Sequence, residues 1–405
     1  MRVFVIGGGG REHALAWKLS KSLVFDKVYA APGNPGIATV AECIQPGAHT
    51  PAGYLRIAEE LGADLTVVGP EAPLVAGVVD AFRAAGRRII GPTAAAARLE
   101  GSKVFSKAFM LRAGVPTARA ETAGDASEAA ELVDRIGYPV VLKADGLAAG
   151  KGVVICADRA EALDALAKLP GGKIVVEEFL SGEEVSYIVL ADGEEFQPLA
   201  ATQDHKAVWD GDRGPNTGGM GAYSDGRIVN AAEEEEILAK VIRPSLVQMV
   251  REGTPYTGFL YAGLMMTPNG VKVLEFNARL GDPETQALMH RMDSDFGAVL
   301  WEKEPIRWKA DPAVCVVLAA HGYPGEVRSG DIIQGIDGCG AEVFQAGTRK
   351  GANGLETAGG RVLGVTASGH DLETAIRNTY SAVTQIRFDR MHYRKDIGQK
   401  GLKRW

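Results

Sequence analysis

Polar side chains near residue 275 could carry phosphoryl chemistry with a metal ion. In the stretch LEFNARLGDPE, residues 274–284, Glu275 and Asn277 stand two positions apart on a predicted strand, so they point to the same face. A carboxylate and an amide oxygen are ligands that Mg²⁺ accepts, and Mg²⁺ usually shares its coordination shell with substrate phosphates. Arg279 follows on that face and could stabilise charge on a transferring phosphoryl group. We predict a divalent-cation site, for Mg²⁺ or Mn²⁺, with Arg279 as its catalytic neighbour.

A glycine-rich loop between two predicted strands could hold a polyphosphate. The stretch KADGLAAGKG, residues 143–152, has Lys143 at its start and Gly150 and Lys151 near its end. A Walker A loop would need glycine where Asp145 stands and a helix after the lysine, so this loop is of another kind. Because backbone N–H groups and ammonium charges bind phosphate oxygens, we predict that Lys143, Gly150 and Lys151 contact a polyphosphate. An ordinary flexible hairpin is the alternative.

The stretch VVEEFLSGEE, residues 175–184, could hold the nucleoside part of a nucleotide. An adenine ring needs a backbone edge and an apolar slot, which Glu177, Phe179 and Leu180 could form. A ribose needs a carboxylate that accepts from its hydroxyls, and Glu184 is the candidate. An ordinary acidic turn is the alternative, since such turns are common.

The first glycine run, in VFVIGGGGREH at residues 3–13, invites comparison with a dinucleotide-binding turn. The G-x-G-x-x-G spacing fails at Glu12 and His13, and the next predicted strand ends without an acidic residue for a ribose. A redox cofactor is therefore not expected. The amide groups at a helix N-terminus can still bind an anion.

A long polar stretch, residues 201–225, is predicted to be a functional loop. Its glycine content argues against regular structure, and long loops over a compact domain are often functional or disordered. His205 could act as a base there, but a loop histidine is more often solvated, and we favour that interpretation.

The elements that must position these residues follow two patterns. Before residue 100, short apolar strands alternate with helical stretches, which is typical of a doubly wound parallel sheet that binds ligands at the carboxyl ends of its strands. Later strands and helices mix with glycine loops. We predict an α/β and α+β protein of three domains: an N-terminal substrate-binding domain at 1–100, a central domain at 101–310, and a small β-rich domain at 311–405.

Composition argues against two classes of partner. The 405 residues carry a net charge of −7, whereas nucleic-acid binding usually needs a basic surface. No apolar run is long enough to span a membrane, and the first residues lack a signal-peptide pattern. Four cysteines stand without zinc spacing and are expected to be buried thiols. We predict a cytoplasmic protein that can function as a monomer.

Taken together and in this order, the motifs resemble those of the ATP-grasp ligases, and more closely those of the glycinamide ribonucleotide synthetase family. The resemblance runs from Val5 to Gly398. It rests on stretches that include GGGGREHALAWKL, APGNPG, GSKVFSKAFM, EEFLSGEEVS, QDHK, GPNTGGMGAYS, EFNARLGDPETQ and YRKDIG. The lysine–glycine loop and the E-x-N pair are common to ATP-grasp enzymes, whereas GPNTGGMGAYS and EFNARLGDPETQ are specific to the family.

The resemblance implies an ATP-dependent ligase of purine biosynthesis. Glycine and 5-phosphoribosylamine would be joined through glycyl phosphate, giving glycinamide ribonucleotide, ADP and phosphate. An ATP-grasp domain with a mobile lid at about 118–185 is implied as well. The resemblance places Lys103 beside Lys143 on the ATP phosphates. It adds five substrate-binding positions, Asp212, Thr217, Gly221, Asp282 and Pro283.

The implied substrate carries a phosphate, which gives the first glycine run a role. We predict that Gly9 and Gly10 cradle that phosphate at a helix N-terminus. Glu71, in the turn GPEAPL, would reach the ribose or the amine.

Two departures and two alternatives stay open. Ala207 follows DHK where the family pattern suggests arginine, and the stretch LYAGLMM before the E-x-N pair lacks a third acidic metal ligand. Another ATP-grasp ligase, such as a carboxylase subunit or a dipeptide ligase, is one alternative. A non-catalytic nucleotide sensor is the other.

Overall fold

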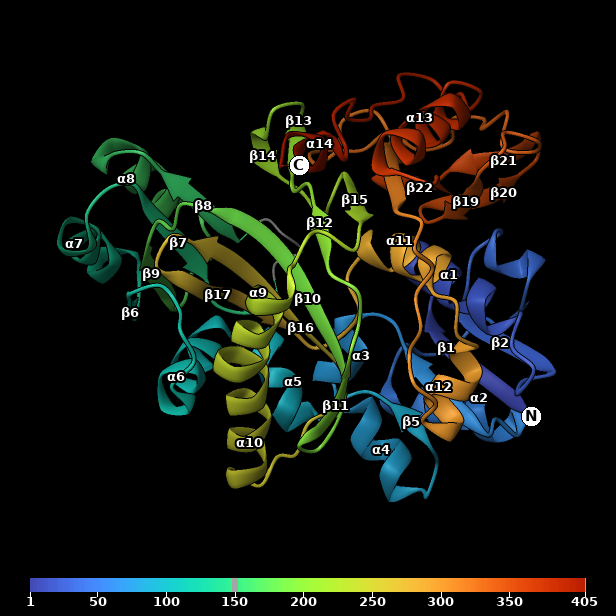
Figure 1. Ribbon diagram of the computed structural model, residues 1–405, viewed down its shortest axis with the longest axis horizontal. Helices are drawn as coiled ribbons and strands as arrows, with labels where there is room; N and C mark the ends of the chain where they lie inside the picture. Colours follow the sequence, from blue (N-terminus) through green and yellow to red (C-terminus); the bar gives the residue numbers. More distant parts are fainter. Residues whose placement is uncertain (148–151, 405) are drawn as a thin grey trace.

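The computed structural model describes residues 1–147 and 152–404. These residues form a five-stranded, a four-stranded and a nine-stranded sheet with two separate hairpins (Figure 1). Within the described ranges, no helix is both long and apolar enough to cross a membrane.

The N-terminal region is a parallel sheet with strand order β3-β2-β1-β4-β5, which confirms the predicted doubly wound fold. Its strands are β1 (Arg2–Gly7), β2 (Lys27–Pro32), β3 (Glu42–Cys43), β4 (Leu65–Val68) and β5 (Ile89–Ile90). Its helical segments are α1 (Gly10–Leu19), η1 (Ile37–Thr39), α2 (Pro51–Leu61), α3 (Glu71–Val75), α4 (Val78–Ala84) and α5 (Ala94–Gly101). The sequence did not reveal β3, because two residues show no periodicity.

A small antiparallel sheet with order β6-β9-β7-β8 has a core of its own. Its strands are β6 (Ala120–Ala123), β7 (Val140–Ala144), β8 (Val153–Cys156) and β9 (Ile174–Glu178), and its helices are α7 (Ala126–Ile136) and α8 (Arg159–Lys168). Leu132 and Val133 of α7 pack with Leu142 of β7 in that core. In Figure 1 this unit lies at the far side of the molecule from β1 and β2.

The nine-stranded sheet has the order β17-β16-β10-β12-β15-β18-β22-β19, with β11 paired to β10. Its strands are β10 (Glu183–Asp192), β11 (Glu195–Pro198), β12 (Thr202–Asp204), β15 (Gly221–Ser224), β16 (Thr257–Thr267), β17 (Gly270–Asn277), β18 (Ala313–Ala319), β19 (Glu342–Gln345) and β22 (Arg361–Ser368). The hairpins are β13 (Ala207–Trp209) with β14 (Arg213–Asn216), and β20 (Thr348–Gly351) with β21 (Gly354–Thr357). The accompanying helices are α6 (Lys103–Ala113), α9 (Ala231–Ile237), η2 (Leu238–Ile242), α10 (Arg243–Arg251), α11 (Glu284–Arg291), α12 (Phe296–Glu302), α13 (Leu372–Val383) and α14 (Gln399–Arg404).

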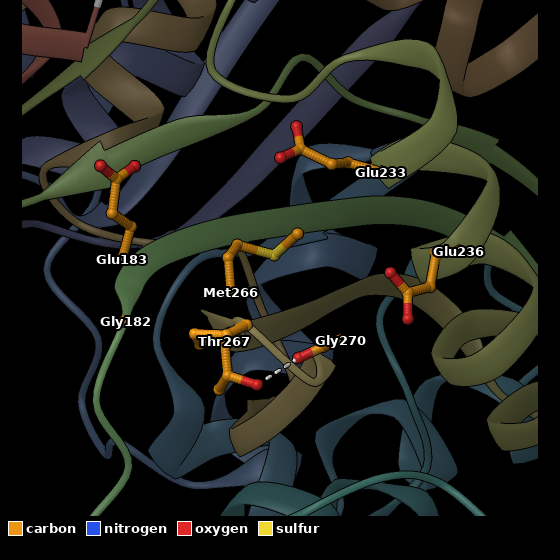
Figure 2. Close-up of a pocket in the computed structure, with 8 residues that line it drawn as sticks. Gly182, Glu183, Glu233, Glu236, Met266, Thr267 and Gly270 are labelled. Atoms are coloured by element: carbon orange, nitrogen blue, oxygen red, sulfur yellow. Dashed lines mark hydrogen bonds between the residues drawn. The ribbon is translucent and has the colours of Figure 1, made fainter.

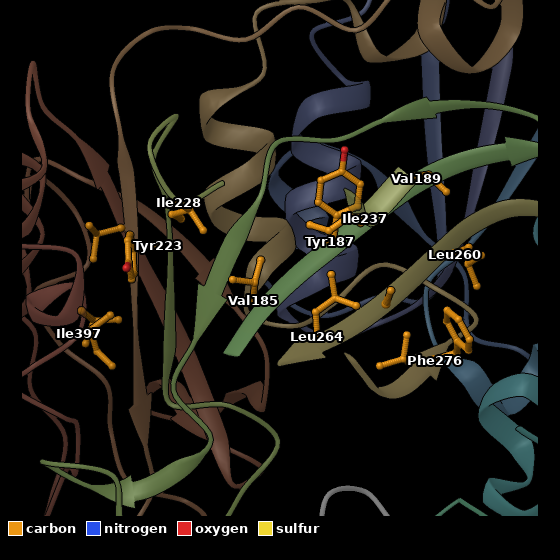
Figure 3. Packing of buried hydrophobic residues seen from close by; sticks show 14 of the residues in the cluster. Val185, Tyr187, Val189, Tyr223, Ile228, Ile237, Leu260, Leu264, Phe276 and Ile397 are labelled. Atoms are coloured by element: carbon orange, nitrogen blue, oxygen red, sulfur yellow. The ribbon is translucent and has the colours of Figure 1, made fainter. Parts of the chain in front are cut away.

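This sheet runs through the domain boundary predicted near residue 310. Strand β15 pairs with β12 on one side and with β18 on the other, where Gly221 lies opposite Val316. One hydrophobic cluster also spans the boundary, since it includes Val185, Tyr223 and Ile397 (Figure 3). The region after residue 313 therefore extends the central sheet instead of forming a sheet of its own.

The prediction of an irregular loop at 201–225 is wrong. The segment contains β12, β13, β14 and β15. Glycine is required there by close packing: a Cβ at Gly221 would lie 2.7 Å from the carbonyl oxygen of Cys315 and 2.7 Å from Ile397 Cγ1. The glycines thus permit neighbouring segments to approach the strands, and they do not prevent strand pairing.

We expect Gly221→Ala to lower the free energy of unfolding by about 1–3 kcal/mol, because the added methyl group would overlap backbone and Ile397. Urea denaturation measures the loss. The control is Gly171→Ala, where no atom lies within 4 Å of an added Cβ. A Gly221→Ala variant as stable as the control would contradict this packing.

Candidate active site

A cavity of about 620 Å³ lies where the N-terminal region, the four-stranded sheet and the nine-stranded sheet meet. The nine-stranded sheet contributes residues from before and after residue 313, such as Glu275 and Arg361. It brings together predicted residues from distant parts of the sequence. The predicted residues that line it are Glu71, Lys103, Lys143, Glu177, Phe179, Leu180, Glu184, Thr217, Glu275, Asn277, Arg279 and Asp282.

Strand β17 directs the predicted metal ligands into the cavity. Its pairing with β16 is irregular, because β17 carries one extra residue at Leu274. The carbonyl of Leu274 accepts a hydrogen bond from Lys143 Nζ at 2.9 Å. Glu275 and Asn277 follow and both line the cavity, as their spacing predicts.

The residues present fit a divalent cation that arrives with a nucleotide. Burial alone would raise the pKa of Glu275, but the charges of Lys206 and Lys143 outweigh burial and hold the pKa below its ordinary value. The carboxylate is therefore ionised at neutral pH. Among the described residues, no group of three or more His, Cys, Asp and Glu side chains is arranged to hold a metal. Glu275 and Asn277 would supply two oxygens, and phosphates and water would complete the shell, as is usual for Mg²⁺.

The carboxylate of Glu177 bridges two buried lysines. Its Oε2 lies 2.8 Å from Lys143 Nζ, and its Oε1 lies 3.0 Å from Lys107 Nζ. Lys107 is on α6, whereas Glu177 and Lys143 are on the four-stranded sheet. The prediction that Glu177 lines an adenine slot thus holds at most for its backbone, because its side chain holds the lysines.

Lys103 fixes the glycine loop that follows β7. Its Nζ donates to the carbonyl of Gly146 at 2.8 Å, and the hydroxyl of Ser102 donates to Asp145 Oδ1 at 2.9 Å. Burial lowers the pKa of Lys103, and the charge of Glu275 opposes the effect of burial. The predicted ATP contacts Gly150 and Lys151 lie outside the described residues.

An apolar slot lies beside a paired carboxylate at the nucleoside end of the cavity. Phe179 is 41% exposed, which is unusual for a phenylalanine, and it lines the cavity with Leu180 and Ile155. Glu184 pairs with Lys206 at 2.8 Å. Lys206 was missed as a site residue, although it follows Asp204 at alternate spacing in the DHK stretch.

Two carboxylates hold the guanidinium of Arg279. Its Nε lies 3.2 Å from Glu71 Oε2, and its Nη2 lies 2.9 Å from Glu100 Oε1. Burial raises the pKa of Glu100, and the charge of Arg279 opposes that rise. Nη2 also lies 3.4 Å from Oδ1 of Asn277. Arg279 therefore stands beside the predicted metal ligands, with its charge balanced from α3 and α5.

Arg361 of β22 brings the region after residue 313 into the cavity. Its Nη1 donates to the carbonyl of Asp282 at 2.6 Å and to the carbonyl of Gly218. The hydroxyl of Tyr323 accepts from the Gly218 amide at 3.0 Å, and Tyr323 and Arg361 both line the cavity. Sequence reasoning missed both, because nothing near them marks a site and only the pairing of β15, β18 and β22 brings them there.

Carboxylates already occupy the N-terminus of α1. The amide of Gly9 donates to Glu12 Oε2 at 2.6 Å, and the amide of Arg11 donates to Asp282 Oδ2 at 3.3 Å. Neither Gly9 nor Gly10 lines the cavity, whereas Arg11 does. The phosphate cradle at Gly9 and Gly10 therefore stays a prediction, and Arg11 is the residue of this turn that lines the cavity.

Three other predicted positions lie outside the cavity lining. Asp212 pairs with Arg394 at 2.9 Å and with Lys400 at 2.5 Å. Gly221 is enclosed within the sheet, and Pro283 is buried behind the cavity wall, against Gly219. Motif membership alone could not separate residues that face a cavity from residues that support its wall.

His205 is only 1% exposed, so the expectation of a solvated histidine is wrong. Burial lowers the pKa of the imidazole to about 3, and the positive charges of Lys400 and Arg394 lower it further. Within the described ranges, neither ring nitrogen has a hydrogen-bond partner. His205 does not line the cavity and cannot take a proton from a ligand there.

A further polar group of the cavity was not predicted. Tyr261 donates to Glu284 Oε1 at 2.9 Å, and both line the cavity. Burial raises the pKa of Asp204 to about 7. The negative charge of Glu284 also raises this pKa, whereas the positive charge of Lys206 lowers it. These residues sit on β12, β16 and α11, and no local pattern indicates that the three elements meet at one cavity.

A second recess, of about 420 Å³, is lined by different residues (Figure 2). They are Gly182, Glu183, Glu233, Glu236, Met266, Thr267, Pro268 and Gly270. No predicted site residue is among them, and the lining is acidic. This recess does not suit an anionic substrate, and the larger cavity is the candidate active site.

Comparison with known proteins agrees with this arrangement. Family models of phosphoribosylglycinamide synthetase match in order: the N domain at residues 1–100, the ATP-grasp (A) domain at 101–285 and the C domain at 313–400. A phosphoribosylamine–glycine ligase from Ralstonia nicotianae is 48% identical, and the match covers all of both chains.

Solved structures show the same fold. The crystal structure of phosphoribosylamine–glycine ligase from Thermotoga maritima matches with a TM-score of 0.86 and 34% identity, covering 98% of this chain and 100% of that one. A biotin carboxylase from Campylobacter jejuni matches with a TM-score of 0.74 over 99% of this chain and 95% of that one, but at 15% identity. That second likeness concerns the fold alone.

We expect Lys107→Met to lower the free energy of unfolding by about 3 kcal/mol, because it leaves Glu177 buried with one cation instead of two. Urea denaturation measures the change. The control is Lys272→Met, which removes the partner of the more exposed Glu178 at 3.0 Å and should cost less than about 1 kcal/mol. Equal losses in the two variants would contradict a buried bridge.

Proposed function

This chain belongs to the phosphoribosylglycinamide synthetase family, and on that basis we propose how its cavity carries out the family reaction. The protein is an ATP-dependent ligase that joins glycine to phosphoribosylamine in purine biosynthesis. One observation carries the proposal: a single cavity holds buried lysines, a Glu–Asn pair on one strand and an arginine clamped by two carboxylates.

The reaction runs in two steps without a protein nucleophile. A carboxylate does not acylate an amine at neutral pH, because its oxygen is a poor leaving group. Transfer of the γ-phosphoryl group of ATP to a glycine carboxylate oxygen gives glycyl phosphate and ADP. The amine of phosphoribosylamine then attacks the carbonyl carbon, the bond to phosphate oxygen breaks, and the nitrogen loses a proton. The protein supplies position and charge.

The nucleotide occupies the end of the cavity between the four-stranded and the nine-stranded sheet. Lys103 and Lys143 contact the phosphates of ATP, because both ammonium groups line the cavity near Glu275. Phe179 and Leu180 contact the adenine, and Glu184 accepts from the ribose hydroxyls. The backbone edge after β9 serves the adenine, since the Glu177 side chain is held by lysines.

Glu275 and Asn277 would hold the divalent cation, Mg²⁺ or Mn²⁺, together with the phosphates of ATP. When bound, such a cation neutralises charge on the β- and γ-phosphates. Arg279 stands on the same face and stabilises charge on the transferring phosphoryl group. Its carboxylate partners, Glu71 and Glu100, keep the guanidinium in place before substrates bind.

Glycine and phosphoribosylamine occupy the opposite end. Arg361 and Arg11 are the cations there: Arg361 pairs with Asp282 at 3.4 Å, whereas the guanidinium of Arg11 pairs with Glu12 at 2.6 Å. We assign the phosphate of phosphoribosylamine to this end and the ammonium group of glycine to the acidic side chains of Asp204 and Glu284. Thr217 closes the wall between the two.

Residues of about 118–185 act as a lid over the nucleotide. The unit has its own core, and it contacts α6 through polar bonds: Asp145 with Ser102, Gly146 with Lys103, and Glu177 with Lys107. Closure would exclude water, which hydrolyses an acyl phosphate. The units 1–100, 101–310 and 311–405 remain our proposal for the three functional parts.

We propose a cytoplasmic enzyme that works as a monomer. The cavity of a single chain already offers a candidate residue for each role in the proposed chemistry.

The reaction is tested by measuring ADP release with a panel of substrates. We expect turnover only when glycine and phosphoribosylamine are both present, because the second step consumes the acyl phosphate that the first step forms. Turnover with bicarbonate or D-alanine would favour another ATP-grasp ligase. ATP binding without ADP release in the full mixture would favour a nucleotide sensor.

Glu275→Gln should lower kcat on the order of 100-fold, because a neutral amide replaces the charged ligand beside the phosphates. It should also raise the Mg²⁺ concentration that gives half-maximal turnover. The control is Glu195→Gln on the exposed strand β11, which should leave both values unchanged. Wild-type metal dependence in the Glu275 variant would remove this residue from the metal site.

A further inference from the structure

Residues 392–400 lie along the hairpin of β13 and β14, and a buried arginine joins the two. Arg394 is 0% exposed. Its Nε and Nη2 donate to the carboxylate oxygens of Asp396 at 2.7 and 2.6 Å, and its Nη1 donates to Asp212 in the hairpin turn at 2.9 Å. Nη1 also donates to the carbonyl of Ala207 at 3.1 Å. We call Arg394, Asp212 and Asp396 the Arg394 cluster.

Other contacts follow the same path along the hairpin. The amide of Lys395 donates to Asp210 Oδ1 at 2.8 Å. Nε2 of His392 lies 2.8 Å from the carbonyl oxygen of Val208. The segment and the hairpin are therefore joined at several points, of which the Arg394 cluster is the buried one.

Asp212 has a left-handed backbone conformation, which glycine adopts more readily than aspartate. Its φ is 56°, in the left-handed region that residues with a Cβ rarely adopt and that glycine adopts readily. The carboxylate binds both Arg394 and Lys400. An aspartate at this position thus stands where glycine would suit the backbone better, and its side chain supplies the bonds that glycine lacks.

Both ends of the hairpin reach the cavity. Lys206, just before β13, pairs with Glu184 at 2.8 Å. At the other end, Asn216, Thr217 and Gly218 line the cavity. The amide and the hydroxyl of Thr217 each donate to the carbonyl of Lys206 at 2.8 Å, so that the two ends are tied together.

The later end of the hairpin lies at the substrate end of the cavity. Gly218 contacts Tyr323 and Arg361, and Arg361 also contacts Asp282. The lysines that we assign to ATP have other partners: Lys103 binds the carbonyl of Gly146, and Lys143 binds Glu177 and the carbonyl of Leu274. A shift of residues 216–218 would therefore disturb the phosphoribosylamine side directly, and it would reach the nucleotide side indirectly, through the Lys206–Glu184 ion pair.

We propose that the Arg394 cluster positions residues 216–218 and thereby sets the affinity for phosphoribosylamine. The inference rests on the proposed function, since it concerns one wall of that site. The cluster residues do not line the cavity, so they act through the hairpin and not on the reacting atoms.

The test is Asp212→Gly in the full-length protein, because glycine suits the positive φ and removes only the side-chain bonds. We expect the KM for phosphoribosylamine to rise about 3- to 30-fold while the KM for ATP changes less than about twofold. Hydrogen exchange at the amides of 217 and 218 should become faster. The control is Arg390→Gly, at an exposed residue with φ 48° that contacts His321, and it should match wild type.

Two results would overturn the inference. One is an unchanged KM for phosphoribosylamine and unchanged exchange at 217 and 218 in Asp212→Gly. The other is an equal rise in the KM of all three substrates, which would indicate a general structural brace. If wild type itself shows no turnover with glycine and phosphoribosylamine, the proposed function fails. The exchange measurement then still decides whether the cluster positions the wall.

Discussion

The bridge from Glu177 to Lys107 and Lys143 is the interaction on which the rest of the site depends. Burying one carboxylate between two ammonium groups is favourable only when both partners are fixed, because an unpaired charge at such depth is costly. The bridge joins α6 to the four-stranded sheet and so fixes the position of the proposed lid relative to α6. The same rule recurs elsewhere: Glu71 and Glu100 hold Arg279, and Asp282 lies against Arg361. The cations that we assign to phosphate groups are thus held in place by carboxylates, most of them from other elements.

The continuous sheet gives these paired charges a common frame. Strand β17 carries Glu275 near one edge, and β22 carries Arg361 toward the other. Between them, β12 and β15 flank the hairpin whose ends reach the cavity. The proposed metal ligands and Arg361, which we assign to the substrate end, therefore stand on one continuous sheet.

The sequence predicted the parts of the site that local patterns encode. Glu275 and Asn277 follow from the period of two, and the N-terminal parallel sheet follows from strand–turn–helix alternation. Arg361 and Tyr323 could not be predicted, because strand pairing over long sequence distances brings them to the cavity. Lys107 could not be predicted either, because it meets Glu177 only when α6 packs against the four-stranded sheet. The prediction for the glycine-rich segment 201–225 is wrong for a related reason. Gly221 is needed there because Ile397 packs closely against it, and the local sequence does not show that contact.

The place of β15 in the sheet also bears on how the chain is made. Once residues 221–224 have paired with β12, their other edge exposes backbone groups that only residues 313–319 later cover. Unpaired strand edges recruit other chains. During synthesis on the ribosome, the half-formed sheet must therefore wait with an open edge, and chain segments made in between have to fold without closing it. That interval is therefore the stage at which the open edge of β15 is most accessible to a strand of another chain.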